Sequence, residues 1–295
     1  MPRPAAISTL KRTPISSRFT KQLIDVNDQL CFSALRQHEF EQMLAPILLA
    51  HASDFTTSVF PSDPFAKTIY RKIGDLPCFS HESGQIELRM GVIASAEFAL
   101  AYLEEAQTFR QSLLQTEHDG VKNDAEEEQL RLKLHHWSSG APVSGFFRTL
   151  GYLRLLRNHY AHVNDEPDPA FENYARSHGT PLNKFWAARP TDVHGIDFKS
   201  PGFQRLTPDL MFGIMNVLRV SLQHIDAMVA DTLSLFDCVR YCVEDVLRSK
   251  NGQQLSVARV TSKVRMRLRM DWNIEASAAD LLPLVEQAIT QATTH

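Results

Sequence analysis

Apolar side chains recur at intervals of three and four residues along most of this chain, which is the spacing of an α-helix. The clearest stripe contains Val92, Ala96, Ala99 and Leu103, and its alanines allow close packing against another helix. We therefore predict an all-α protein. The expected helices cover residues 25–51, 86–114, 126–137, 143–163, 208–235, 236–248 and 278–292, and Val257, Val260, Val264 and Leu268 indicate one more.

Prolines and polar clusters separate these helices. Pro46 is expected to kink or divide the helix at 25–51, and residues 52–85 are expected to be irregular apart from a short helix at 64–73. Residues 164–207 are rich in Pro, Gly, Asn and His, and they are too many for an ordinary connection. Because this segment also carries aromatic and basic side chains, it either packs over the preceding helix or forms part of a substrate groove.

The pattern divides the chain into four parts. Residues 1–25 are expected to be a flexible basic tail, and residues 26–85 a helical and irregular N-terminal extension. Residues 86–235 are expected to form a helical bundle, and residues 236–295 a small C-terminal helical region. The predicted bundle helices are those at 86–114, 126–137, 143–163 and 208–235.

Composition and charge narrow the class of protein. The chain has 295 residues, of which 43% are hydrophobic, so it can bury a substantial core. The net charge is −3, but acids cluster at 117–128 and bases follow Asp245, so any contact with a polyanion would be local. We find neither an apolar run long enough to span a membrane nor a signal-peptide core, and we expect no membrane partner.

Four cysteines without a CxxC pair indicate reduced thiols, and hence a cytoplasmic location. Cys238 and Cys242 are one helical turn apart. We interpret them as small residues on a buried face, although the spacing would also allow a metal ligand pair.

Candidate chemistry is concentrated near the end of the helix at 143–163. Asn158 and His162 lie one turn apart on one face, Arg154 lies one turn before them, and Arg157 is next to them. Arginine supplies a fixed cation, asparagine an amide, and histidine an acid or base near neutral pH. The group would be a site on a rigid element.

The run Arg157-Asn158-His159-Tyr160-Ala161-His162 resembles the signature of the HEPN superfamily, in which an arginine and a polar residue precede three free positions and a histidine. The resemblance implies a four-helix up-and-down bundle and a metal-independent endoribonuclease of the toxin or phage-defence type, without a cofactor. It also implies a homodimer in which two motif helices surround one RNA phosphate, often restrained by an antitoxin or another defence partner. Arg157, Asn158 and His162 would then be catalytic.

Other side chains are candidates for support of this site. His159 is a less certain second acid or base, and Arg154 could add charge. Glu97, on the helix at 86–114, could orient a motif residue, although solvent exposure or an ion pair explains it equally well.

Two other functions are compatible with the same sequence. One is a non-catalytic HEPN-like module that binds RNA, a nucleotide or a protein through the same basic pocket. The other is a DNA-binding regulator that uses residues 253–270. Arg259, Lys263 and Arg267 recur there every four residues, and this row could bind a phosphate backbone as a substrate-binding surface or be ordinary solvated surface.

Overall fold

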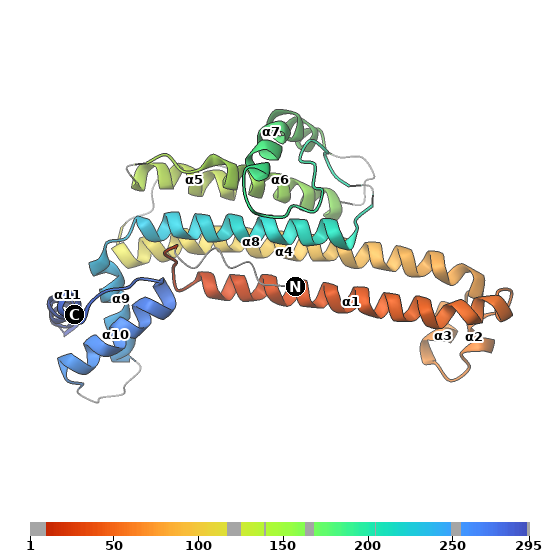
Figure 1. The fold of residues 1–295 in the computed structure, drawn as a ribbon, viewed down its shortest axis with the longest axis horizontal. Helices are drawn as coiled ribbons and strands as arrows, with labels where there is room; N and C mark the ends of the chain where they lie inside the picture. The colour runs from red at the N-terminus through yellow and green to blue at the C-terminus, as the bar shows by residue number, and fades with distance from the viewer. Residues whose placement is uncertain are drawn as a thin grey trace.

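The computed structural model describes residues 10–116, 125–138, 140–162, 168–203, 205–248 and 255–293 (Figure 1). These ranges are helical and contain no β-strand, which confirms the predicted all-α class. The helices are α1 (Ser16–His51), α2 (Thr56–Val59), α3 (Pro64–Ile69), the 3₁₀ helix η1 (Ile73–Asp75), α4 (Leu76–Leu114), α5 (Glu126–Trp137), α6 (Ser144–Ala161), α7 (Pro169–Ala187), α8 (Pro208–Asp231), α9 (Leu235–Arg248), α10 (Val257–Trp272) and α11 (Ala278–Thr293).

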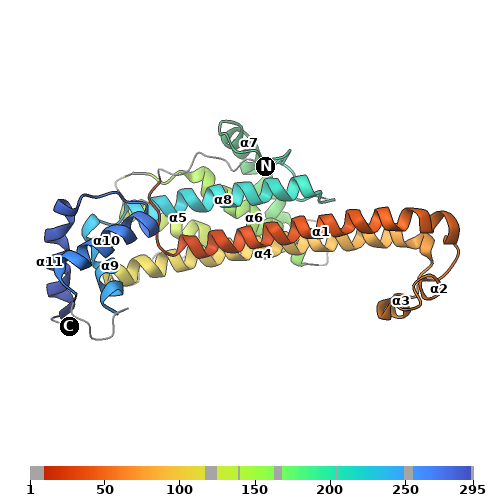
Figure 2. The same ribbon diagram turned by 60° about the horizontal axis from the view of Figure 1, so that its bottom comes forward.

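The centre of the molecule is formed by α1, α4, α6 and α8, which lie side by side (Figures 1 and 2). On α1 and α4, Phe19 contacts Tyr102 and Leu30 lies against Gly91, so these two helices are antiparallel. On α8, Met215 accepts a hydrogen bond from Ser95, and Asp226 accepts one from Tyr102, so α8 runs parallel to α4. α5 packs against α4 and α6 as a shorter addition.

The helix α1 is longer and more central than the sequence indicated. It begins at Ser16, so residues 16–25, which we expected in a flexible tail, are helical, and Phe19 and Leu23 are buried in the main core. Pro46 lies inside the helix and does not divide it. Residues 1–9 of the predicted tail, and 117–124 of the acidic segment, lie outside the described residues.

α4 also begins earlier than predicted, at Leu76 instead of residue 86. Pro77 occupies its first turn, where a missing N–H removes no intrahelical hydrogen bond. The short helix predicted at 64–73 is α3, which ends at Ile69 because Tyr70 adopts the left-handed conformation. The Asp63 side chain accepts hydrogen bonds from the Phe65 and Ala66 amides and fixes the start of α3.

We predicted no helix within residues 164–207, but the structure has α7 there. This helix has Asp168 as its cap and Pro169 in the first turn, and it continues through Pro181. Its aromatic side chains Phe171 and Trp186 are buried against α6, and the Trp186 Nε1–H donates to Thr149 Oγ1 at 2.9 Å. The segment therefore packs over the motif helix, which is the first of the two roles left open.

α9, α10 and α11 form a separate small core at the end of the molecule opposite α2 and α3 (Figure 1). Cys238 and Cys242 are buried in it, and burial raises the pKa of each thiol to about 12. Their predicted role as packing residues is confirmed.

In the described part of the chain, no helix has an apolar stretch of the length needed to cross a bilayer.

Candidate functional site

The motif residues lie at the C-terminal end of α6. The helix ends at Ala161, and His162 is extended at the cap position, where its backbone N–H donates to the Asn158 carbonyl at 3.0 Å. The expected end at residue 163 was two residues too late. Leu153 and Leu156 are buried and anchor this end of α6, so the motif is attached to a rigid element.

Arg154 is used within the fold. Its Nε and Nη2 atoms contact both carboxylate oxygens of Glu127 on α5, at 3.1–3.2 Å, and the Glu127 side chain is 6% exposed. A paired guanidinium of this kind holds α5 against α6. Arg154 therefore has a structural role between α5 and α6, and its guanidinium is directed to Glu127 and not to the exposed end of the motif.

Arg157 is held at two points. Its Nη2 forms an ion pair with Glu97 of α4, and its Nη1 donates to Asn158 Oδ1 at 2.7 Å. The Nε atom is buried and has no hydrogen-bond partner among the described residues. The guanidinium thus keeps donor capacity that the chain does not use, and Glu97, a predicted support residue, contacts it directly.

The two motif histidines lie in different surroundings. His162 is exposed to solvent, whereas His159 is partly buried beside the rings of Tyr160 and Phe171. A methyl group on Gly202 would approach the His159 ring to about 3.0 Å, so the segment that follows α7 lies close to this ring. His162 is the more accessible acid or base.

Arg89 of α4 is a neighbour of the motif that sequence reasoning missed. Its guanidinium lies over the Tyr160 ring at 5.7 Å, and the Tyr160 hydroxyl donates to the Phe203 carbonyl at 3.2 Å. Burial raises the pKa of Tyr160 to about 12, so this phenol stays protonated at neutral pH. Arg89 and Glu97 are eight residues apart on α4, which is the only signal in the sequence that they share a face.

The row Arg259, Lys263 and Arg267 is not brought to the motif. It lies on α10, which packs against α9 and α11, and Figure 1 shows this end of the molecule away from the C-terminal end of α6. Arg267 forms ion pairs with Asp245 at 2.5 Å and with Asp271 at 3.7 Å.

In the described ranges, no three His, Cys, Asp or Glu side chains come close enough together to hold a metal ion.

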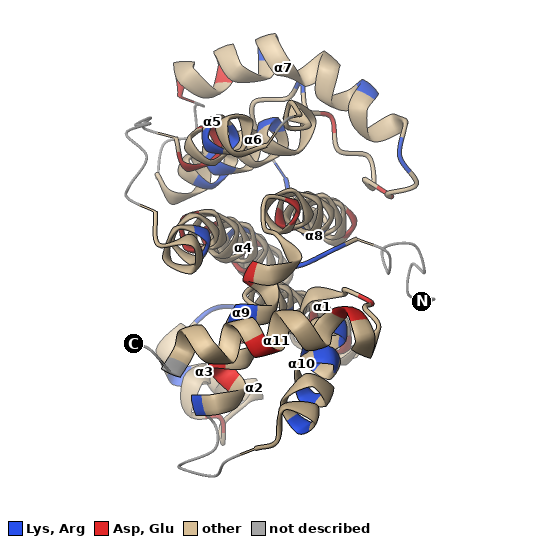
Figure 3. Cartoon of the chain, turned by 90° about the vertical axis from the view of Figure 1, so that its left-hand side faces the viewer, with Lys and Arg blue, Asp and Glu red and all other residues tan. Residues whose placement is uncertain are grey.

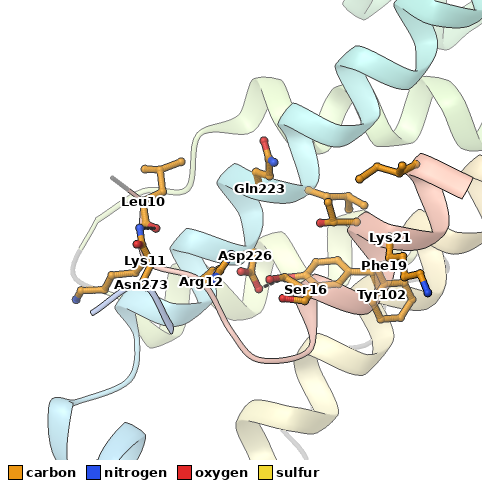
Figure 4. A pocket seen from close by; sticks show the side chains of 14 residues that line it. Leu10, Lys11, Arg12, Ser16, Phe19, Lys21, Tyr102, Gln223, Asp226 and Asn273 are labelled. Carbon is orange, nitrogen blue, oxygen red and sulfur yellow. Dashed lines mark hydrogen bonds between the residues drawn. The ribbon is translucent and has the colours of Figure 1, made fainter. Parts of the chain in front are cut away.

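A cavity of about 570 Å³ lies where the N-terminal segment, α1, α4 and α8 meet (Figure 4). Most polar side chains that line the cavity have partners within the protein. Lys11 pairs with Asp231 at 3.0 Å, and Arg12 donates to the Met270 carbonyl. The buried Asp226 carboxylate accepts hydrogen bonds from Thr13 and Tyr102 at 2.5–2.8 Å. We interpret these groups as a joint that attaches the N-terminal segment to the bundle.

Comparisons with known proteins give no relative. No protein-family model matches the chain, and neither a curated protein nor a solved structure matches it.

Proposed function

We propose that this chain is a HEPN-type endoribonuclease that cleaves RNA without a metal ion. The observation that carries the proposal is the arrangement at the end of α6, where Arg157 is fixed by Glu97 and Asn158 while His162 is exposed. The arrangement of α1, α4, α6 and α8 is compatible with a HEPN-like bundle, in which the motif lies at one end of a helix.

Each motif residue has a role in this reaction. His162 would take the proton of the 2′-hydroxyl as its oxygen attacks the phosphorus, and Arg157 would stabilise the charge that builds up on the phosphoryl oxygens. The bond to the 5′-oxygen then breaks, and that oxygen needs a proton. The products are a 2′,3′-cyclic phosphate and a 5′-hydroxyl. Asn158 would hold the Arg157 side chain, as its 2.7 Å contact in the free chain indicates.

One copy of the chain offers one exposed motif histidine, and the reaction needs a base and an acid. We therefore propose a homodimer in which the partner's His162 supplies the second role. Growth arrest through cleavage of cellular or phage RNA, under the restraint of an antitoxin or defence partner, is the cellular context that the motif supports.

A non-catalytic binding module is the second candidate, and the exposed Arg157–Glu97 ion pair is compatible with it. Arg157 is already paired with Glu97, so a phosphate must compete with a carboxylate for this guanidinium. Because the Glu97 side chain is 50% exposed, that ion pair is worth little in water and a polyanion could displace it.

RNA cleavage by the purified protein in excess chelator tests the proposal. We expect wild type to cut and to leave cyclic phosphate ends, and Arg157→Ala and His162→Ala each to lower the rate by about 100-fold or more. His136→Ala is the matched control, because His136 is an exposed histidine on α5. RNA binding without cleavage would support the binding module instead, and equal rates for all variants would contradict a role for the motif.

A further inference from the structure

α10 is an amphipathic helix whose apolar side is buried in the core that it forms with α9 and α11. Val260, Val264, Leu268 and Trp272 are each 0% exposed. The opposite side carries the exposed Arg259 together with Met266 and Met270, which are 55% and 61% exposed. Arg265 is also exposed, but it lies about 120° round the helix from Arg259. Figure 3 shows basic positions recurring along α10.

The charges on this side are not balanced locally. Of the five bases of α10, Arg267 is neutralised by Asp245 and Asp271, and Arg269 pairs with Glu275 at 3.0 Å. Both members of the second pair are more than 70% exposed, so this pair contributes little and can exchange its partner. Within the described residues, Arg259, Lys263 and Arg265 have no carboxylate partner.

We propose that Arg259 and Lys263, with Met266 and Met270 beside them and Arg265 about 120° farther round the exposed arc of α10, form a surface that binds the phosphate backbone of RNA; we call it the α10 surface. The choice of RNA rests on the proposed function. Arg259 and Lys263 are one helical turn apart, a rise of about 6 Å, so the α10 surface offers several cations to consecutive phosphates. The sequence suggested Arg267 as the third base of this surface. We replace it with Arg265, because Arg267 is already paired with Asp245 and Asp271.

The structure favours RNA over a membrane for this surface. Amphipathic helices bind membranes by burying their apolar side in the lipid. The apolar side of α10 is inside the protein core, and two methionines remain outside. The α10 surface therefore has charge to offer a polyanion but little apolar area to insert into lipid.

The α10 surface also lies apart from the motif, on the outside of the unit formed by α9, α10 and α11. It would thus anchor a long RNA without taking part in the reaction. Removing its charges should weaken binding of a long strand and leave cleavage of a short one unchanged.

The test measures binding of a 20-nucleotide single-stranded RNA by fluorescence anisotropy at several salt concentrations. The parent protein and the triple variant Arg259→Gln, Lys263→Gln, Arg265→Gln both carry His162→Ala, which separates binding from cleavage. We expect the triple variant to bind about tenfold or more weakly at low salt, with a salt slope smaller by about 2, because each lost phosphate contact in a single strand contributes about 0.7. The matched control is Lys67→Gln, Arg71→Gln, Lys72→Gln, which removes three exposed bases near α3.

Equal binding by the triple variant and its parent would overturn the inference, as would stronger binding to anionic lipid vesicles or to duplex DNA than to RNA. If the triple variant loses binding but the protein with an intact motif does not cut RNA, the α10 surface is supported and the proposed nuclease activity fails. If that protein cuts RNA and the triple variant binds normally, the nuclease survives and the α10 surface is rejected.

Discussion

Asp226 on α8 is the side chain around which the N-terminal segment is attached. It is 1% exposed, and burial raises the pKa of its carboxyl group although hydrogen bonds from Thr13 and Tyr102 lower it. A raised carboxyl pKa means that the folded protein binds a proton more tightly than the unfolded chain. This group therefore lowers the free energy of unfolding as the pH rises above the unfolded value of about 4.

Replacing Tyr102 with Phe removes one donor to the Asp226 carboxylate, at 2.6 Å in wild type. The decrease in the free energy of unfolding should be about 1 kcal/mol greater at pH 7 than at pH 4, because the Tyr102 hydroxyl stabilises the ionised Asp226 carboxylate more than the protonated one. Urea unfolding at both pH values measures it. Tyr152→Phe is the control, since its hydroxyl donates to the neutral Ser200 carbonyl at 2.7 Å and its loss should not depend on pH. Equal pH dependence of the two variants would contradict the assignment.

The Arg154–Glu127 pair gives a second prediction for a single residue. Glu127→Gln removes the carboxylate from a largely buried guanidinium and should lower the free energy of unfolding by about 3 kcal/mol. Glu128→Gln is a close control, because the Glu128 carboxylate pairs with Arg131 near the surface and should contribute less than about 1 kcal/mol. Chemical unfolding of the two variants compares them directly, and equal losses would show that Arg154 does not depend on Glu127.

Among the elements, α1 contains a proline that the helix tolerates at a cost. Pro46 cannot donate a hydrogen bond to the Gln42 carbonyl, and its ring crowds the preceding turn. Because Pro46 is exposed and the helix continues on both sides, Pro46→Ala should raise the free energy of unfolding by about 1–3 kcal/mol. A thermal unfolding midpoint below that of wild type would mean that the proline stabilises this part of α1.

α7 depends on a close approach at Gly179. A methyl group at that position would lie 2.6 Å from the Phe198 carbonyl oxygen and 2.7 Å from the Lys199 Cα, so the backbone on one side must move. Gly179→Ala should therefore lower the free energy of unfolding by about 1–2 kcal/mol, despite the better helix propensity of alanine. Gly140→Ala, where a methyl group meets nothing within 4 Å, should change it little. Thermal unfolding of the pair of variants is the measurement.

The helices α5 and α7 show what the sequence could and could not predict. α5 has the predicted bounds because its apolar spacing is regular and polar residues flank both ends. α7 was missed because Gly179 and Pro181 weaken the helical signal, and its aromatic residues are stabilised by contacts with α6 that no local pattern contains. An ion pair was one of the roles that the sequence left open for Glu97, and Glu97 does pair with Arg157. The ion pair between Arg154 and Glu127 could not be predicted, because it depends on how α5 packs against α6.

At the scale of the whole molecule, we predicted that residues 26–85, which include most of α1, form an extension outside the bundle. The structure shows that the first turns of α1 complete the core with α4 and α8, while the later part lies with the start of α4 in an extension that ends at α2 and α3 (Figures 1 and 2). Such a long-range pairing of two helices is not recorded in the periodicity of either one.

This extension carries an apolar stripe that leads to the candidate site. Phe79, Ile86 and Met90 on α4 are 44%, 62% and 58% exposed, and their spacing places them on the same side of the helix as Glu97. Glu97 is the partner of Arg157. An apolar surface continuous with the motif is where the second copy of the proposed homodimer would bring its own His162 near the first.

We expect Ile86→Glu with Met90→Glu to convert a dimer to a folded monomer and to abolish RNA cleavage, because two charges would be buried at the contact. Leu49→Glu with Phe65→Glu is the control, since these side chains are 92% and 70% exposed but lie outside the stripe. Sedimentation measures the oligomeric state, and circular dichroism verifies the fold. A wild type that stays monomeric at all concentrations, or a stripe variant that stays dimeric, would contradict this arrangement.

A mixing experiment separates a shared site from two independent ones. Arg157→Ala and His162→Ala should each be inactive alone. If one phosphate is bound between two copies, mixing and re-equilibrating the variants forms heterodimers that keep one arginine and one histidine at the shared site. Their cleavage rate should exceed that of either variant alone but stay well below wild type, because the second histidine role is unfilled. If each copy instead holds a complete site, no mixture can regain activity, and the apolar stripe would then serve assembly alone.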